Sequence, residues 1–234
     1  MPRQRAVDRK PGGLGGALHR AGTSVTRPSA ASGYYDRTAA FYDGMMRVSS
    51  WLDHVDERSE RAHLVSMLRL QPGQSVLVVA VGTGRDLPLI SLQVGSQGRL
   101  LGVDLSRPML NQCRRKTRRL GLSAGLVQAE AAWLPIASAT FDAVLLFGGL
   151  NSFRDRPGAL LEIVRVTRCG GEIVISDKSL RPRRRLPLRH RLMIRLRRES
   201  VLPPPIDLMP FPAQKVSLSW FWGGTFYILA ARKP

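Results

Sequence analysis

Two short segments of the chain combine a buried strand pattern with residues that can hold a nucleoside. An apolar run over 75–81 leads into Gly82-Thr83-Gly84, and a helical pattern begins just after it. A glycine-rich turn between strand and helix lets a ligand approach the backbone closely. A second apolar run, over 100–103, ends at Asp104, a carboxylate suited to accept hydrogen bonds from a ribose diol. The pair indicates an adenosine-containing cofactor at the carboxyl edge of a doubly wound sheet.

The spacing of small residues after the first run argues against a dinucleotide. Dinucleotide folds use Gly-x-Gly-x-x-Gly to seat a pyrophosphate, and here the third position is Leu87. Residues 76–84 read VLVVAVGTG, which resembles the first motif of class I S-adenosylmethionine-dependent methyltransferases, especially those that modify quinones and phospholipids. The resemblance implies that S-adenosylmethionine is the cofactor and that Ala80, Gly82, Thr83 and Gly84 contact it.

The resemblance continues along the chain in order. Residues 102–110 resemble the second motif of the family. This implies that Asp104 binds the ribose, that Leu105 lies beside the cofactor, and that Met109 packs against adenine. Residues 165–171 resemble the turn that leads into the fifth strand. Several motifs in order and at fitting spacing are a far more specific signal than one glycine turn.

Two further motifs extend the implied cofactor site. Residues 129–135 resemble the third motif, which implies that Glu130 accepts from the adenine amino group and that Ala131 lies beside it. Residues 141–149 resemble the fourth strand of the family, which implies that Phe147 also contacts the cofactor.

Two residues depart from the family pattern. Val78 stands where the family has an acid that helps hold the methionine ammonium group, and Ala80 replaces the first glycine, so its methyl group narrows the backbone's approach to the ligand. These departures leave two hypotheses for function. One is methyl transfer to a small or lipid-like acceptor, such as a quinone, a polyketide or another secondary metabolite. The other is a repurposed, non-methylating protein of this fold, either a biosynthetic cyclase or an accessory subunit.

The residues that bind the methyl acceptor are harder to identify from the sequence, because methyl transfer mainly requires that the reactants be positioned and water excluded. No catalytic residue is assigned. The resemblance implies that the segment containing Tyr35 and Tyr42 caps the pocket, with packing of the helix as the alternative for both tyrosines. Asn151, in the loop after the fourth strand, either orients an acceptor or satisfies the backbone of its loop.

The remaining pattern predicts one α/β domain over 34–234 behind a disordered basic tail over 1–33. Helices are expected over 34–70, with a continuous one over 51–70, and over 85–94, 106–120 and 157–168. Strands are expected over 75–81, 99–103, 125–129, 142–147 and 172–176, followed by a hairpin over 215–220 and 225–231. The result is a seven-stranded, mostly parallel sheet with an antiparallel last strand. Neither a metal site nor a disulfide is expected from the scattered His and Cys residues.

The distribution of basic residues indicates possible binding partners. The formal net charge is +19, and residues 178–198 hold ten Lys or Arg and no acid. This segment reads as a solvated helix face, as an interface for an anionic membrane surface, or as a site for an acidic partner. Nucleic acid is disfavoured, because the segment has no interleaved aromatic residues. The two scattered cysteines, which we expect to be reduced thiols, favour a cytoplasmic protein. Peripheral membrane association is the alternative, and organelle targeting by the N-terminal tail is disfavoured. The oligomeric state stays open.

Overall fold

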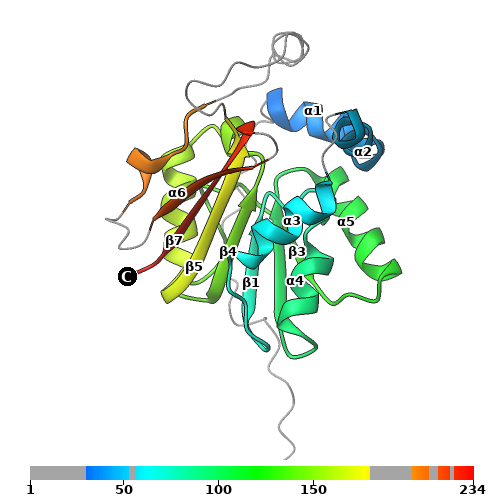
Figure 1. Ribbon diagram of the computed structural model, residues 1–234. Coiled ribbons are helices and arrows are strands. Elements are labelled where there is room, and N and C mark those ends of the chain that lie inside the picture. The colour runs from blue at the N-terminus through cyan, green and yellow to red at the C-terminus, as the bar shows by residue number, and fades with distance from the viewer. Residues whose placement is uncertain (1–29, 53–55, 180–201, 211–215, 222–223) are drawn as a thin grey trace, which may run out of the picture.

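The computed structural model describes residues 30–52, 56–179, 202–210, 216–221 and 224–234. Its centre is a seven-stranded sheet in the order β3-β2-β1-β4-β5-β7-β6 (Figure 1). Strand β7 runs antiparallel to its neighbours β5 and β6, and the other neighbouring pairs are parallel. The strands are β1 (Ser75–Val79), β2 (Arg99–Asp104), β3 (Gly125–Gln128), β4 (Phe141–Phe147), β5 (Thr167–Lys178), β6 (Ser217–Phe221) and β7 (Phe226–Arg232). The predicted doubly wound, mostly parallel α/β fold is confirmed.

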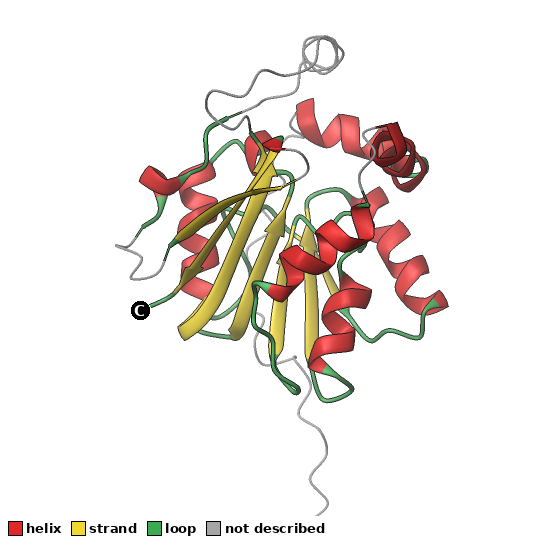
Figure 2. Cartoon of the chain, viewed as in Figure 1, coloured by secondary structure: helices red, strands yellow, loops and turns green. Residues whose placement is uncertain are grey.

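Helices cover both faces of this sheet (Figure 2). They are α1 (Ala30–Thr38), α2 (Tyr42–Leu52), α3 (Glu57–Ser66), α4 (Leu87–Val94), α5 (Arg107–Arg119) and α6 (Arg156–Val166), with short 3₁₀ turns η2 (Leu150–Ser152) and η3 (Ile206–Leu208). Successive side chains of β1 point to opposite faces. Val76 and Val78 pack in one apolar cluster with α3, α4 and α5, and Leu77 and Val79 pack in another with α6. Both faces are buried, as parallel strands require.

Side-chain caps fix where the site helices begin. The Ser106 hydroxyl accepts from the Met109 amide at the start of α5, and the Asp155 carboxylate accepts from the Gly158 amide at the start of α6. An N-cap of this kind satisfies one of the amides that have no partner inside the helix. The cap at Ser106 therefore sets α5 directly after Asp104, at the end of β2.

Some predicted boundaries differ from the structure. Helix α1 begins at Ala30, four residues before the expected start of the domain, and residues 1–29 lie outside the described part. The predicted continuous helix over 51–70 is wrong, because α2 ends at Leu52 and Asp56 caps a new helix, α3, through the amides of Arg58 and Ser59. Thr167 belongs to β5 rather than to the preceding helix.

Helices α1 and α2 lie over the carboxyl ends of the parallel strands (Figure 1). Two side-chain hydrogen bonds attach them there: Ser106 donates to Asp36 of α1 at 2.5 Å, and Thr83 donates to Asp43 of α2 at 2.6 Å. The N-terminal segment is therefore fastened to the same edge at which the glycine turn and Asp104 lie. Among the described residues, none of the helices is both long enough and apolar enough to span a bilayer.

Candidate functional site

The turn after β1 places three residues in the left-handed region of backbone space. Ala80, Gly82 and Gly84 have φ values of 53°, 55° and 75°, a conformation that glycine adopts without a Cβ penalty. The Gly82 amide donates to Oδ2 of Asp104 at 2.7 Å. The turn and the end of β2, which the sequence paired as a nucleoside site, therefore meet at the carboxyl edge of the sheet.

The far side of this turn is packed tightly against α5. A Cβ placed on Gly84 would lie 2.5 Å from Sγ of Cys113 and 3.1 Å from a methyl carbon of Leu87. The first distance is shorter than real Cβ contacts and the second is tighter than most of them, so glycine is favoured here by packing as well as by its φ value. Thr83, between the two glycines, is buried and donates its hydroxyl hydrogen to Asp43.

Ala80 is the residue of the turn that departs from the family pattern. Its φ of 53° is unfavourable for a residue with a Cβ, at a cost of about 1–2 kcal/mol. The methyl group points toward the loop after β4, where a Cβ on Gly149 would come within 3.2 Å of it. Gly149 has no Cβ and a φ of 102°, so a small residue in that loop accommodates the extra methyl group of Ala80.

Val78, the other departure, faces away from the turn. Its side chain is buried in the apolar cluster formed with α3, α4 and α5. Position 78 therefore contributes packing in this chain.

Asp104 holds the end of β2 to the turn. Its Oδ1 accepts from the Ser106 amide at 2.9 Å, while Oδ2 accepts from Gly82. Burial raises the pKa of the Asp104 carboxyl, and the nearby Asp36 carboxylate raises it further, against the lowering effect of the backbone amides. Each carboxylate oxygen has a second lone pair, so the group can still accept from two ribose hydroxyls.

The residues expected to contact adenine differ in exposure. Met109 is buried in α5, and Leu105, directly after β2, is exposed. Ala131 is buried and Glu130 is partly exposed. The Glu130 backbone carbonyl accepts from the Trp133 amide at 3.0 Å, whereas its carboxylate has no hydrogen-bond partner among the residues that the structure describes. That carboxylate is available to an exocyclic amine.

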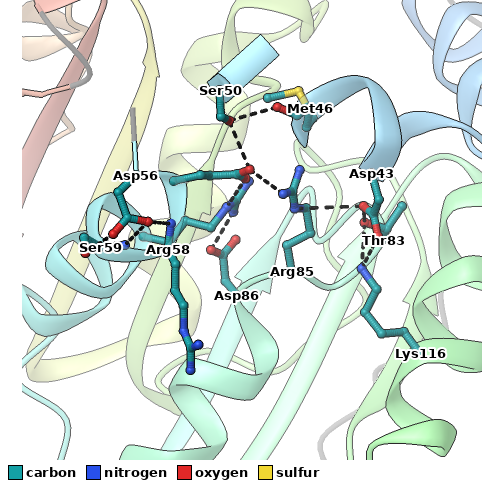
Figure 3. A network of polar contacts seen from close by, with 12 residues as sticks. Asp43, Met46, Ser50, Asp56, Arg58, Ser59, Thr83, Arg85, Asp86 and Lys116 are labelled. Atoms are coloured by element: carbon teal, nitrogen blue, oxygen red, sulfur yellow. Dashed lines mark hydrogen bonds and ion pairs between the residues drawn. The ribbon is translucent and has the colours of Figure 1, made fainter. Parts of the chain in front are cut away.

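A network of charged side chains lies beside the turn (Figure 3). Arg61 of α3 donates to Oε1 of Glu57 at 2.7 Å and to Oδ1 of Asp86 at 2.6 Å. Arg85, directly after the turn, pairs with Glu57 and lies 3.9 Å from Asp43. The Arg61 guanidinium also stacks over the Phe147 ring, 4.6 Å from its centroid. The network therefore joins α3 to the residues directly after the glycine turn.

The same network reaches α2 and α5. Lys116 of α5 donates to Oδ2 of Asp43 and, at 3.3 Å, to the Thr83 hydroxyl. Burial alone would raise the pKa of Asp43, but hydrogen bonds from Lys116 and Thr83 hold it below its usual value. Asp43 is thus ionised at neutral pH and ties the N-terminal helices to the middle residue of the turn.

These charged residues do not stand out as site residues in the sequence. The detectable signal was the i, i+4 spacing of Glu57 and Arg61, which places the two on one helix face. Nothing in the sequence shows that Asp43, Asp86 and Lys116 converge on the turn, because they come from segments separated by tens of residues.

Tyr35 and Tyr42 lie together at the mouth of the site. Their ring centroids are 6.3 Å apart in an edge-to-face arrangement. Burial raises the pKa of both hydroxyls, and the charges of Asp104 and Asp177 contribute to the shift at Tyr35. Tyr35 is therefore close to the carboxyl ends of both β2 and β5, between the nucleoside side and the acceptor side.

Asn151 mainly holds its own loop. Its backbone amide donates to Asp177 at 2.8 Å, and its Nδ2 donates to the Lys178 carbonyl at 2.7 Å. The amide oxygen Oδ1 is buried without a hydrogen-bond partner in the described structure. The backbone role considered from the sequence is therefore present, and one acceptor atom of Asn151 stays unused.

Phe147 is at the end of β4 as predicted, but its ring is already engaged. It packs against Phe221 and Phe226 with centroid distances of 5.9 Å each, beneath Arg61. Of the basic segment 178–198, only Lys178 and Ser179 fall within the described residues. In that described part, no three His, Cys, Asp or Glu side chains group as metal ligands.

Comparison with known proteins agrees with this geometry. Residues 77–175 match a family model described as a methyltransferase domain. The ubiquinone/menaquinone biosynthesis C-methyltransferase UbiE of Klebsiella pneumoniae is 33% identical over 147 residues, or 62% of this chain and 57% of that protein. The demethylmenaquinone methyltransferase of Listeria welshimeri is 31% identical over 146 residues, or 62% of this chain and 61% of that protein. The chain thus spans about three fifths of the length of these relatives.

Solved structures share the fold. A SAM-dependent methyltransferase from Aquifex aeolicus superposes with a TM-score of 0.58 at 20% identity, covering 78% of this chain and 92% of that one. Phosphoethanolamine N-methyltransferase 2 of Haemonchus contortus, in complex with S-adenosyl-L-methionine, gives a TM-score of 0.70 at 14% identity, covering 88% of this chain and 60% of that one. Residues 77–175 thus match a methyltransferase domain, and the chain shares the fold of these solved methyltransferases.

Proposed function

We propose that this protein binds S-adenosylmethionine across the carboxyl ends of β1, β2 and β3 and transfers its methyl group to a small, lipid-like acceptor. The observation that carries the proposal is the contact between Asp104 and the Gly82 amide. It sets a carboxylate with spare lone pairs beside a backbone that a ligand can approach closely. The cofactor would supply an electrophilic methyl group on a positively charged sulfur.

The residues of the site fit the parts of such a cofactor. Asp104 would accept from the ribose hydroxyls, Met109 and Leu105 would bracket the adenine, and the unpaired Glu130 carboxylate would accept from its amino group. Ala80, Gly82, Thr83 and Gly84 would present the turn backbone to the methionine end. Ala131 and Phe147 would line the pocket, Phe147 by its backbone, since its ring packs elsewhere.

The N-terminal helices would help to position the acceptor and to exclude water. Because the leaving group in methyl transfer is neutral, the protein must mainly hold the acceptor in line and exclude water. Helices α1 and α2 cover the mouth through the Asp36 and Asp43 contacts, and Tyr35 and Tyr42 would line the acceptor pocket with Asn151. No side chain is assigned as a general base.

The acceptor class is inferred from the relatives. Two are named for methylation in ubiquinone or menaquinone biosynthesis, which supports a quinone-like acceptor. The alternative, a non-methylating protein of this fold, draws support from Ala80, whose methyl group fills space between the turn and Gly149. Methyl transfer to an acceptor distinguishes these two proposals.

Calorimetric titration with S-adenosylhomocysteine tests the cofactor proposal. Wild-type protein is expected to bind, and Asp104→Asn is expected to weaken binding by about 1–3 kcal/mol through the loss of charge-assisted bonds. The matched control is Asp142→Asn. Asp142 also accepts from a backbone amide, that of Ser75 at 2.8 Å, but at the amino ends of the strands. An absence of wild-type binding at millimolar ligand rejects the proposal.

Mass spectrometry then tests the reaction. Protein that binds the cofactor is incubated with S-adenosylmethionine and a panel of demethylated quinols. A product heavier by one methyl group supports the enzyme. Cofactor binding without any methylated product across quinol, phenol and polyketide acceptors favours the non-methylating alternative.

We also propose that the basic segment 178–198 binds an anionic surface. Its ten basic residues and lack of acids support an electrostatic interaction, which must fade as the Debye length shrinks from about 30 Å at 0.01 M salt to about 10 Å at 0.1 M. Replacing Arg183, Arg184, Arg185 and Arg189 with Gln is expected to remove the additional binding to anionic vesicles that appears at low salt. Loss of a pulled-down acidic protein without any effect on vesicles would favour an acidic partner instead.

A further inference from the structure

Four large apolar side chains of the N-terminal helical segment are exposed to solvent. They are Tyr34, Phe41, Val48 and Trp51, exposed by 46, 77, 58 and 75%. Elsewhere in the described chain, exposed apolar residues are spread one or two at a time over separate elements. Isolated exposed apolar residues are normal on a protein surface, whereas a group of them marks an interaction site.

Three of these residues lie on one face of α2. The Phe41 carbonyl accepts the first hydrogen bond of this helix, from Met45 at 2.9 Å. Val48 and Trp51 follow at positions i+7 and i+10. At 3.6 residues per turn, these positions fall within about 80° of one another around the helix axis. Phe41, Val48 and Trp51 therefore form a continuous outward stripe.

The inner face of α2 is fully engaged with the domain. Asp43 binds Thr83 and Lys116, Ser50 donates to Glu57 at 3.2 Å, and Met46 packs against the apolar cluster of α3 and α4. The exposure of the outer stripe is therefore not a sign of a loosely attached helix. The helix is fixed on one side and presents an apolar surface on the other.

Basic side chains flank the stripe. Arg37 and Arg47 are exposed on α1 and α2. Asp43 is half-buried and bonded to Thr83, and Asp36, although exposed, is held by a hydrogen bond from Ser106. The outer surface of α1 and α2 therefore combines aromatic side chains with arginines.

We propose that this surface, formed by Tyr34, Arg37, Phe41, Arg47, Val48 and Trp51 and here called the α1–α2 face, docks on an anionic lipid surface. Aromatic residues beside arginines are the composition of helices that lie in the headgroup region of a bilayer. A second copy of the chain is a poorer occupant, because each chain carries a net charge of +19 and two such faces would bring their arginines together.

The position of the α1–α2 face relates docking to the proposed reaction. Helices α1 and α2 lie over the carboxyl ends of the strands (Figure 1), so docking would bring the mouth of the site to the bilayer. That consequence rests on the proposed lipid-like acceptor, whereas the docking itself does not. The two can therefore fail separately.

Vesicle flotation tests the proposal on the full chain. Vesicles contain phosphatidylcholine with one third phosphatidylglycerol, at 0.15 M salt, where long-range attraction is screened. Phe41→Ser with Trp51→Ser is expected to weaken binding at least tenfold. The control pair is Leu92→Ser with Trp133→Ser, which removes side chains exposed by 83 and 73% on other elements and should bind as the wild type does. Arg37→Gln with Arg47→Gln should weaken binding to these vesicles and leave the weaker binding to pure phosphatidylcholine unchanged.

A second measurement, fluorescence quenching, uses a variant that keeps an aromatic residue at position 51 of the α1–α2 face. Brominated lipids quench tryptophans that enter the acyl boundary, so the quenched component of wild-type fluorescence should vanish in Trp51→Phe while binding persists. Circular dichroism and S-adenosylhomocysteine affinity should be unchanged in all of these variants, which separates loss of docking from loss of the fold or of the cofactor site.

Several results would overturn the proposal. One is a wild type that does not float with the vesicles at this salt concentration. Another is a Phe41/Trp51 double variant that binds as tightly as the control pair. A third is a wild-type dimer in light scattering that the same double variant converts to monomer, which would assign the face to self-association.

Discussion

The buried ion pairs of Arg61 give a prediction whose size follows from the structure. Arg61 and Asp86 are joined at 2.6 Å, with side chains exposed by only 11 and 9%. Replacing Arg61 with Met keeps much of the side-chain volume but leaves Asp86 buried without this partner. Glu57, the other partner of Arg61, keeps its contacts with Arg85 and Ser50. Breaking a buried pair in this way costs about 3–5 kcal/mol. The stacking of Arg61 over Phe147 is lost in the same step.

The chain supplies a matched control for this experiment. Arg168 and Asp142 are also joined at 2.6 Å, but their side chains are exposed by 49 and 24%, and Asp142 keeps its bond from the Ser75 amide. An exposed pair contributes about 0–1 kcal/mol, so Arg168→Met should have little effect. The two pairs share their chemistry and distance and differ in burial, and Arg61→Met additionally removes the contacts with Glu57 and the Phe147 ring.

Urea unfolding followed by circular dichroism and by fluorescence measures both variants, with coincident transitions as the check on two-state behaviour. Arg61→Met with Asp86→Leu should recover much of the loss, because no uncompensated carboxylate then remains. If Arg61→Met costs less than about 1 kcal/mol, or no more than Arg168→Met, the network does not hold α3 to the glycine turn as argued.

Three further predictions follow from the site. Gly84→Ala should lower the free energy of unfolding by about 2 kcal/mol or more, since its Cβ would clash with Cys113 at a positive φ, and Cys113→Ala should restore part of it in the same urea assay. Affinity for S-adenosylhomocysteine should fall as the pH is lowered from neutral through the raised pKa of Asp104, because ribose hydroxyls need an ionised acceptor; titrations at a series of falling pH values should find this dependence absent in Asp104→Asn. Val78→Asp should destabilise the protein by several kcal/mol, as it buries a carboxylate in an apolar cluster, and tighter cofactor binding in this variant would contradict that view of position 78.

Local patterns in the sequence determined the fold and the nucleoside end of the site. Apolar runs of strand length, a glycine turn and caps such as Ser106 are set by backbone and near-neighbour chemistry, so they can be read along the chain. The same holds for the pairing of Gly82 with Asp104, because Gly82 lies in the turn after β1 and Asp104 ends β2, its neighbour in a parallel sheet. The break between α2 and α3 was missed, since an apolar period continues through residues that end one helix and cap the next.

Only the tertiary structure decided how the site is enclosed. Whether Val78 faces the ligand or the core depends on which face of β1 packs on α3, and Ala80 is accommodated by a glycine in a distant loop. The convergence of Asp43, Arg61 and Lys116 on the turn depends on long-range packing that no local pattern encodes. The exposed stripe of α2 is the clearest case: Phe41, Val48 and Trp51 look like core residues in the sequence, and only the docking of the opposite helix face turns them toward solvent.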